Sequence, residues 1–259
     1  MFATKFVMKP LLFVLIVGTL APSSVELVGK ESSNRVPVLL ELFTSEGCSS
    51  CPPADSLLEA LDMNQPVAGA NVIVLSEHVD YWDEGGWKDP FSSAALTSRQ
   101  RNYGRRFHLD GVYTPQMVVD GQAELVGSRG TQAREAIEKA ARRPKTPLDI
   151  VLTGRDSRSL TVRVGFQPMG GSDGTVFVAL AESHVESQVG GGENSRRHLR
   201  HVAAVRALIP AGTVRVGESF SKQVNMSIPL DAGKGGWRVV AFVQERSSGR
   251  VLGATQLSL

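Results

Sequence analysis

Apolar positions along the first half of the chain follow two alternating periods. Short continuous runs bounded by turn residues predict buried strands, and apolar residues at helical spacing, such as Leu57, Leu58 and Leu61, predict helices. In chain order the pattern predicts a strand at 36–45, a helix at 52–63, a strand at 71–79, a helix opened by Ser92, two strands within 114–127 and a helix at 131–143. Asp120 and Gly121 suit the tight turn between the last two strands. Two crossovers, a hairpin and a covering helix describe a mixed sheet with helices on both faces.

The second half of the chain shows no long helical period. Short apolar segments separated by Gly, Ser, Asp and Pro predict strands at 148–154, 159–167, 175–183, 199–208, 219–230, 236–246 and 250–259. The segment RRPKTP at 142–147 carries two prolines and three cations, so it can neither continue a helix nor pair into a sheet. We therefore expect two domains, an α/β domain at 36–143 and an all-β, sandwich-like domain at 147–259.

The first residues are typical of a secretory signal peptide. Lys5 and Lys9 precede the apolar run 10–21, which is too short to span a bilayer comfortably. We assign residues 1–24 to this signal, with cleavage near Ala21 or, because Pro22 follows Ala21 directly, nearer Ser24, and expect a periplasmic or secreted mature protein. An uncleaved membrane anchor is the alternative. No later segment is apolar for long enough to cross a membrane.

Composition narrows the function classes only slightly. The 259 residues are 42% hydrophobic and 21% charged, as in an ordinary globular chain. The 28 basic and 26 acidic residues are spread along the chain and leave a net charge of +2. Because no strong electrostatic field points to a polyanion, we expect no nucleic-acid partner.

The two cysteines, Cys48 and Cys51, form a CxxC pair where the first strand meets the first helix. A disulfide between them would close so short a loop that chain entropy contributes about 2 kcal/mol, which makes it a poor brace and favours chemistry. A helix start stabilises a thiolate, so we expect an exposed Cys48 to be the nucleophile and a more covered Cys51 to resolve the mixed disulfide. Pro52 disfavours helical angles at Cys51, and the nearby Glu46 carboxylate opposes thiolate formation.

The CSSC motif, the element order and a Thr-Pro pair before the hairpin resemble the thioredoxin superfamily over residues 36–143. More closely, the segments LFTSEGCSSCPPAD, HVDYWD, GWKDPFSS, RQRNY, VYTPQMVVDG and HLRHVAAVR are similar to an exported family catalogued as domain of unknown function 1223. The resemblance implies a thioredoxin-like fold, a redox-type site and a cis peptide bond between Thr114 and Pro115, with Thr114 pairing to an extended substrate peptide. It implies no substrate, because the family has no assigned function.

The loop after the second predicted strand is rich in aromatic and acidic side chains. It lies at the same end of the sheet as the dithiol, the end at which open α/β sheets bind ligands. Trp82 and Trp87 either pack the loop down or form a substrate-facing rim. His78 is a candidate proton relay or soft-metal ligand, and Asp80 is a carboxylate that either modulates the site or caps a turn.

These features favour an exported thiol-disulfide oxidoreductase that acts on protein thiols or disulfides through the dithiol, with no organic cofactor and no resident metal. The main alternative is a copper(I) carrier, because a dithiol with His78 suits that soft ion. A second alternative is a non-catalytic protein-binding module whose dithiol is vestigial. A weaker metal candidate is the set His184, His198 and His201, but HLRH places its two histidines on opposite strand faces, and we expect these residues to be solvated basic side chains.

Overall fold

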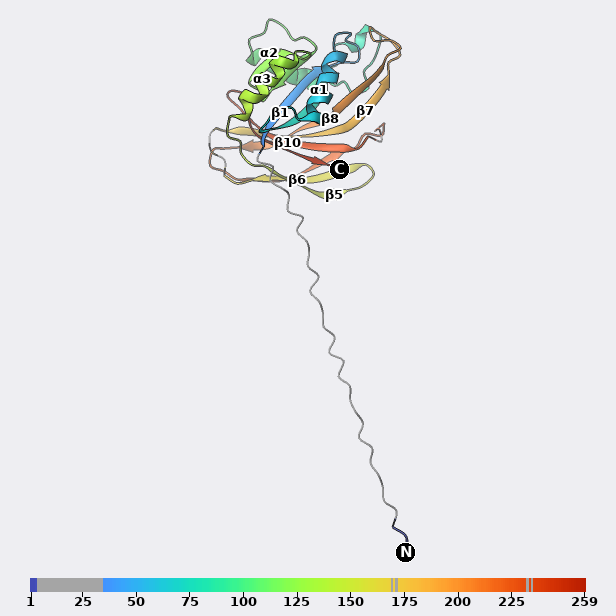
Figure 1. The fold of residues 1–259 in the computed structure, drawn as a ribbon, viewed down its shortest axis with the longest axis vertical. Helices are drawn as coiled ribbons and strands as arrows, with labels where there is room; N and C mark the ends of the chain where they lie inside the picture. The colour runs from blue at the N-terminus through green and yellow to red at the C-terminus, as the bar shows by residue number, and fades with distance from the viewer. Residues whose placement is uncertain (4–34, 169, 171, 232, 234) are drawn as a thin grey trace. The chain divides into compact units, whose positions relative to one another are not determined.

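The computed structural model describes residues 1–3, 35–168, 170, 172–231, 233 and 235–259 (Figure 1). One compact unit spans Asn34–Leu259. Its elements are, in chain order, β1 (Val36–Thr44), α1 (Pro52–Asn64), β2 (Ala70–His78), a short 3-10 helix (Asp83–Gly85), α2 (Ala94–Arg106), β3 (Gln116–Val119), β4 (Ala123–Val126), α3 (Gly130–Ala141), β5 (Asp149–Arg155), β6 (Ser159–Phe166), β7 (Gly174–Gln188), β8 (His198–Val214), β9 (Phe220–Ser227), β10 (Trp237–Glu245) and β11 (Val251–Ser258). Residues 4–24 of the predicted signal peptide lie outside the described residues, and no described helix is both long and apolar enough to span a bilayer.

Eight of the described strands form one sheet in the order β11-β10-β7-β8-β2-β1-β3-β4. β1 and β2 are parallel, and the β3-β4 hairpin continues the sheet on the other side of β1. The hairpin turns at Asp120 and Gly121, whose φ angles of 55° and 65° fit the predicted tight turn. Because β1 and β2 run in the same direction, their last residues, Thr44 and His78, lie side by side at one edge of the sheet.

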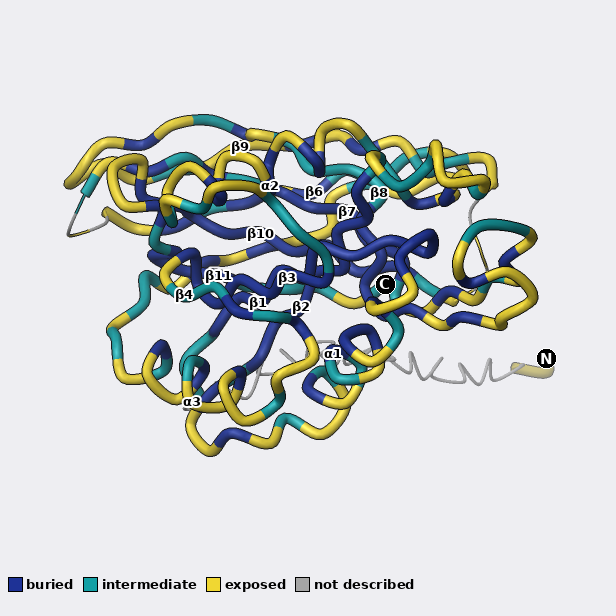
Figure 2. The backbone as a smooth tube through the Cα atoms, turned by 90° about the horizontal axis from the view of Figure 1, so that it is seen from above, coloured by how far each residue is buried: buried dark blue, intermediate teal, exposed yellow. Residues whose placement is uncertain are grey.

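Helices cover both faces of the β1 to β4 part of the sheet (Figure 2). α1 and α3 lie on one face, and α2 lies on the other. Successive side chains of a strand point to opposite faces. Leu42 of β1 therefore lies beside Ala54 of α1. Phe43, on the opposite face, packs edge-on against Tyr103 of α2, with 6.0 Å between the ring centres.

The N-terminus of α2 is capped by Ser93, not by the neighbouring Ser92 that the sequence predicts. Ser93 has an extended backbone, and its hydroxyl accepts a hydrogen bond from the N–H of Leu96. Ser92 instead donates a hydrogen bond to the Asp83 carboxylate at 2.8 Å. The two serines together tie the loop between β2 and α2 to the start of the helix.

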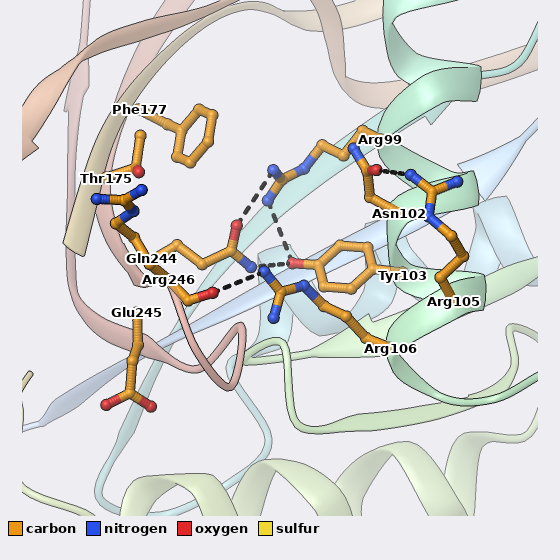
Figure 3. A pocket seen from close by; sticks show the side chains of 10 residues that line it. All are labelled: Arg99, Asn102, Tyr103, Arg105, Arg106, Thr175, Phe177, Gln244, Glu245 and Arg246. Carbon is orange, nitrogen blue, oxygen red and sulfur yellow. Dashed lines mark hydrogen bonds between the residues drawn. The ribbon is translucent and has the colours of Figure 1, made fainter. Parts of the chain in front are cut away.

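A buried guanidinium joins α2 to strands from both halves of the chain. Arg99 pairs with Glu41 of β1. It also donates a hydrogen bond to Gln244 of β10 at 3.4 Å (Figure 3). Its guanidinium carbon lies 5.1 Å from the ring centre of Phe177 and 5.2 Å from that of Phe242. A charge in the interior is tolerated because it is paired and hydrogen-bonded. Arg99 therefore fixes α2 against β1, β7 and β10 at once.

The sheet runs across the domain boundary predicted at 142–147. β8 pairs with β2 in parallel through Ser76 and Ala204, and β11 folds back to contact β1. Apolar side chains of β1, β2, β7, β8, β10 and β11 share one core with those of α1 and α3. The predicted separation into 36–143 and 147–259 is therefore corrected, because the later strands bury apolar side chains in the same core as the earlier ones. The sandwich-like arrangement is local, with the β5-β6-β9 sheet covering β7 and β10.

Candidate functional site

A disulfide joins Cys48 and Cys51 between the end of β1 and the start of α1, with their Cα atoms 5.5 Å apart. Cys51 has helical angles, φ −78° and ψ −38°, directly before Pro52, the first residue of α1. The expectation that Pro52 keeps Cys51 out of the helical region is therefore wrong. The carbonyl of Cys51 accepts hydrogen bonds from the N–H groups of Ala54 and Asp55. Helical bonding begins within the motif, because the prolines occupy first-turn positions that need no N–H donor.

Both cysteines of the motif are buried. Cys48 and Cys51 each expose 0% of their surface, whereas Ser49 and Ser50 between them are exposed. The expectation that Cys48 is exposed is therefore wrong for this conformation. The hydroxyl of Ser50 lies 3.3 Å from Cys48 Sγ. A thiol from solution cannot reach either sulfur unless part of the protein moves.

The loop at 189–197, which connects β7 to β8, is fastened to the disulfide segment. The buried Asn194 donates from Nδ2 to the carbonyls of Glu46 and Cys48, at 2.8 and 2.9 Å. The N–H of Ser49 donates to the carboxylate of Glu193 at 3.0 Å, and hydrogen bonding by Ser49 lowers the pKa of Glu193. Three hydrogen bonds therefore hold this loop against the motif.

The peptide bond between Thr114 and Pro115 is cis, which confirms what the resemblance implies. Pro115 lies close to the first turn of α1, because a Cβ added to Gly127 would stand 3.1 Å from Pro115 Cβ and 3.0 Å from Ala54 Cβ. Glycine at position 127 permits this close approach. The hydroxyl of Thr114 accepts a hydrogen bond from Trp82 Nε1 at 2.8 Å. Thr114 and Pro115 are thus brought to the α1 side of the site.

The two tryptophans of the predicted rim pack against the disulfide segment and its covering loop. Trp82 lies against Gly47, because a Cβ added to Gly47 would stand 3.1 Å from the Cβ of Trp82. Trp87 donates from Nε1 to the Glu46 carboxylate at 2.7 Å. The Trp87 ring also packs on Gly190, with Cζ3 2.8 Å from an added Cβ. Both indole N–H groups have partners within the protein, so in this conformation the tryptophans hold the loop down.

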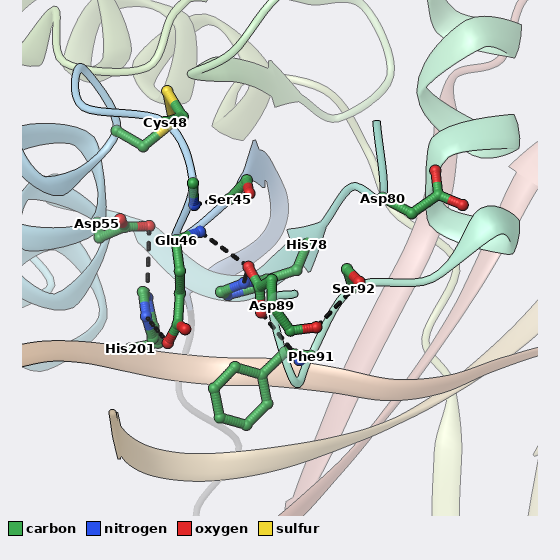
Figure 4. Close-up of polar contacts among 12 residues, drawn as sticks. Ser45, Glu46, Cys48, Asp55, His78, Asp80, Asp89, Phe91, Ser92 and His201 are labelled. Atoms are coloured by element: carbon green, nitrogen blue, oxygen red, sulfur yellow. Dashed lines mark hydrogen bonds and ion pairs between the residues drawn. A yellow bond between two sulfur atoms is a disulfide. The ribbon is translucent and has the colours of Figure 1, made fainter. Parts of the chain in front are cut away.

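His201 of β8 lies between two carboxylates close to the disulfide segment (Figure 4). Its Nε2 is 3.3 Å from Glu46 Oε1, and its Nδ1 is 3.7 Å from Asp55 Oδ1. Burial by itself would lower the pKa of His201, but the Asp55 and Glu46 carboxylates outweigh burial and raise it to about 10. Burial by itself would raise the pKa of Glu46, but hydrogen bonding to His201 leaves it lowered. His201 is therefore a buried cation at neutral pH.

A second buried pair, His78 and Asp89, adjoins the first. His78 Nδ1 and Asp89 Oδ2 are 2.7 Å apart, and neither side chain is exposed. Asp89 also accepts a hydrogen bond from the N–H of Glu46 at 2.8 Å. The rings of His78 and His201 pack edge-on, with 4.6 Å between their centres. Burial would raise the pKa of Asp89, but His78 and the backbone donors lower it to about 2. The two pairs form one continuous polar cluster.

The structure separates the three predicted modulating residues. His78 and Glu46 belong to the polar cluster, but the Glu46 carboxylate points toward His201 and away from Cys48 (Figure 4). Asp80 accepts a hydrogen bond from the hydroxyl of Thr97 at 2.5 Å and lies apart from the cluster. Asp80 therefore braces the loop against α2 in this conformation.

Four buried polar residues of the site were not among the predicted ones: Asp55, Asp89, Asn194 and His201. The expectation that His201 is solvated is wrong, because only 4% of the residue is exposed. One signal in the sequence pointed inward. Leu199 and His201 flank the charged Arg200, and period-two alternation puts His201 on the apolar face of the strand.

The described residues include no group of three or more His, Cys, Asp or Glu side chains arranged to hold a metal ion. His78 uses Nδ1 to contact Asp89, and Cys48 is bonded to Cys51. The arrangement lends no support to the copper(I) hypothesis, which needs a dithiol and His78 in one donor set.

Comparisons with known proteins give a family and a related structure. The family model described as "Protein of unknown function (DUF1223)" matches residues 39–244. A crystal structure of an Agrobacterium tumefaciens protein is 26% identical, with a TM-score of 0.68, and the match covers 87% of this chain and 96% of that one. A domain of the outer membrane lipoprotein Omp28 from Porphyromonas gingivalis is 15% identical over 45% of this chain and 88% of that one, with a TM-score of 0.31. No protein of curated function matches the chain.

The family match spans far more than half of the chain and includes the disulfide segment, the polar cluster and the 189–197 loop. This protein therefore belongs to the DUF1223 family of proteins of unknown function.

Proposed function

We propose that this protein is an exported thiol-disulfide oxidoreductase with a thioredoxin-like arrangement, acting on protein thiols or disulfides. The observation that carries the proposal is the Cys48–Cys51 disulfide at the junction of β1 and α1. The strand order β2-β1-β3-β4, with α1 and α3 on one face and α2 on the other, supports it. The cis bond before Pro115, close to the first turn of α1, supports it further. Export is supported by the apolar run 10–21 that follows two lysines.

The exchange takes place in two steps. A substrate thiolate attacks Cys48 Sγ, a new S–S bond forms, and the Cys48–Cys51 bond breaks with Cys51 leaving as a thiolate. A second substrate thiolate then attacks the substrate sulfur of this mixed disulfide and releases Cys48, so the substrate is oxidised and the protein dithiol is reduced. The same steps in reverse reduce a substrate disulfide. The start of α1 favours the thiolates that the exchange requires.

We propose that the 189–197 loop moves to give access to the disulfide, because both sulfurs are buried and this loop is hydrogen-bonded to the backbone of the segment that carries Cys48. Asn194 contributes two hydrogen bonds to the closed loop, and Glu193 contributes one charged hydrogen bond with Ser49. At about 1 kcal/mol for each of the two buried hydrogen bonds of Asn194, opening costs about 2 kcal/mol, and the exposed contact of Glu193 adds little to this because solvent screens it. The open form is therefore a minor population, and exchange is gated by the loop.

A trapping experiment tests the proposal. In a Cys51→Ser variant the free Cys48 thiolate attacks a substrate disulfide, a Cys48–substrate disulfide forms and one substrate sulfur leaves as a thiolate. The Cys51 thiol that would resolve this mixed disulfide is absent, so substrates from an extract of exported proteins should stay attached and separate on a non-reducing gel. Adding Asn194→Ala removes two bonds of the closed loop and should speed trapping roughly tenfold or more, since about 2 kcal/mol of closure is lost. Asn225→Ala, at an exposed position of β9, is the matched control and should not change the rate. Absence of mixed disulfides even with Asn194→Ala would contradict the proposal.

The burial of both sulfurs favours a second candidate function, a non-catalytic protein-binding module. In this case the disulfide closes the turn at 48–51, and the β-rich part of the surface recognises the partner. A variant with both Cys48→Ser and Cys51→Ser separates the two functions. If it captures exported proteins as well as the wild type does, while the trapping variants form no mixed disulfides, the protein binds partners without exchange.

A further inference from the structure

A cavity of about 520 Å³ lies between α2 and the strands β7 and β10. Its volume is within the range of small-molecule binding sites, roughly 300 to 1,000 Å³. Four arginines line it, Arg99, Arg105 and Arg106 from α2 and Arg246 directly after β10 (Figure 3). The cavity is lined by residues other than those of the disulfide segment and its polar cluster. It is therefore a separate candidate site.

The exposed arginines of this cavity retain donors for a ligand. Within the described residues, the side chain of Arg246 makes no hydrogen bond or ion pair, and Arg105 donates to Asn102 alone. Arg106 donates to two carbonyls of the loop after β10, those of Arg246 and Ser247, at 3.1 and 3.0 Å. These bonds place Arg106 at the mouth of the cavity without neutralising its charge.

The buried Arg99 forms the inner end of the cavity. Its charge is balanced by Glu41, and its Nη1 and Nη2 donate to Gln244 and Tyr103 at 3.4 and 3.2 Å. Each of these nitrogens carries a second hydrogen. Glu77, 3.6 Å from Arg99 Nε, has its pKa raised well above the ordinary value by burial and by the adjacent Glu41. Arg99 therefore supplies further donors from a fixed position.

The charges of the three exposed arginines are not offset within the cavity. Glu245 is the acidic residue of the lining. Its carboxylate accepts a hydrogen bond from Ser248 and lies 3.5 Å from Arg250. Figure 3 shows this carboxylate turned away from Arg99 and Arg106. The cavity therefore attracts an anion.

The rings of Tyr103 and Phe177 also line the cavity, next to the guanidinium groups. A guanidinium matches the geometry of a carboxylate or phosphate and can bind it through two parallel hydrogen bonds. We propose that this cavity binds a small organic anion, whose carboxylate or phosphate group is held by Arg105, Arg106 and Arg246 and whose apolar body packs on the two rings. This binding does not depend on the disulfide or on exchange.

Calorimetric titration of the full protein with three matched probes tests the proposal. Phenyl phosphate and benzoate carry a ring and an anionic group, and benzyl alcohol carries the ring alone. Arg105→Gln and Arg246→Gln each remove one charge at an exposed position, and Arg134→Gln on the exposed surface of α3 is the control. Thermal melting shows that each variant is folded.

We expect at least one of the two anions to bind the wild type and the Arg134→Gln variant equally. We expect its dissociation constant to rise roughly tenfold in each of the other variants, which corresponds to about 1.4 kcal/mol. Tighter binding of phenyl phosphate identifies phosphate as the preferred group, and tighter binding of benzoate identifies carboxylate. Three results would overturn the proposal: no saturable binding of either anion at millimolar concentration, equal affinity for benzyl alcohol, or an affinity unchanged by both cavity substitutions.

Discussion

Replacing His201 with glutamine removes the cation of the polar cluster near the disulfide. Glutamine is similar in size and can donate a hydrogen bond, but it carries no charge. His201 lies 3.3 Å from Glu46 and 3.7 Å from Asp55, with 1% of its side chain exposed. Removing one partner of a buried ion pair costs about 3 to 5 kcal/mol, because the remaining charge is left uncompensated. We expect the free energy of unfolding at pH 6 to fall by about 4 kcal/mol.

The pH dependence of this loss follows from the raised pKa of His201. The pKa is about 10 in the folded protein and about 6.5 for an unperturbed histidine. Below pH 6.5 both states are protonated, so the full stabilisation is present. Between pH 6.5 and 10 the unfolded chain loses this proton while the folded protein keeps it, and about 1.4 kcal/mol is lost for each pH unit. The stabilisation is therefore lost as the pH rises.

Urea unfolding of the wild type and of His201→Gln at intervals from pH 6 to pH 9.5 measures this effect. The difference in unfolding free energy between the two should shrink steadily above pH 6.5 and be close to zero at the upper end. His198→Gln, at an exposed histidine near the start of the same strand, is the matched control and should change the unfolding free energy little at any pH. A difference that is constant with pH would refute the assignment of a buried His201 cation.

Three further predictions concern the packing and charges of the fold. Gly127→Ala should lower the unfolding free energy by about 1 to 3 kcal/mol, because an added Cβ would crowd its neighbours. Gly111→Ala, where an added Cβ meets nothing within 4 Å, is the control and should not lower it. Equal melting temperatures of the two variants in thermal melts would contradict this. The pKa of Asp89 is lowered to about 2, so its stabilisation is present above pH 3.8 and is lost as the pH falls toward 2. Asp89→Asn should therefore lower the unfolding free energy by about 2 kcal/mol at pH 5 and weaken its dependence on pH below 3.8. An unchanged dependence on pH in this range would argue against the assignment. Arg99→Met should cost about 3 to 5 kcal/mol in urea unfolding, and adding Glu41→Gln should restore at least half of that, whereas additive losses would show that the two residues are not coupled.

The sequence predicts only part of the site near the disulfide. Spacing and position after buried strands single out Cys48, Cys51, Glu46 and His78. Asn194 and His201 were not, because their partners lie far away in the chain. Asn194 contacts the carbonyl of Cys48, 146 residues before it, and His201 contacts Glu46, 155 residues before it. No local pattern encodes such contacts.

The predicted exposure of Cys48 failed for the same reason. The position at a strand-to-helix junction is a local property, and the structure has it. Burial is not local, because it depends on segments far away in the chain, and the loop that is hydrogen-bonded to the motif belongs to residues 189–197, beyond the predicted domain boundary. Treating the second half as a separate domain removed that loop from the expected surroundings of the disulfide.

The sequence by itself determined the order and approximate bounds of the strands and helices, the Asp120-Gly121 turn and the junction at which the cysteines lie. These follow from periodicity, capping and turn chemistry, each of which acts over a few residues. The tertiary structure decided that β8 joins β2 in one sheet, that both sulfurs are covered and that His201 is a buried cation. These depend on which apolar faces pack together, because burial and charge pairing arise between segments that only the folded chain brings into contact.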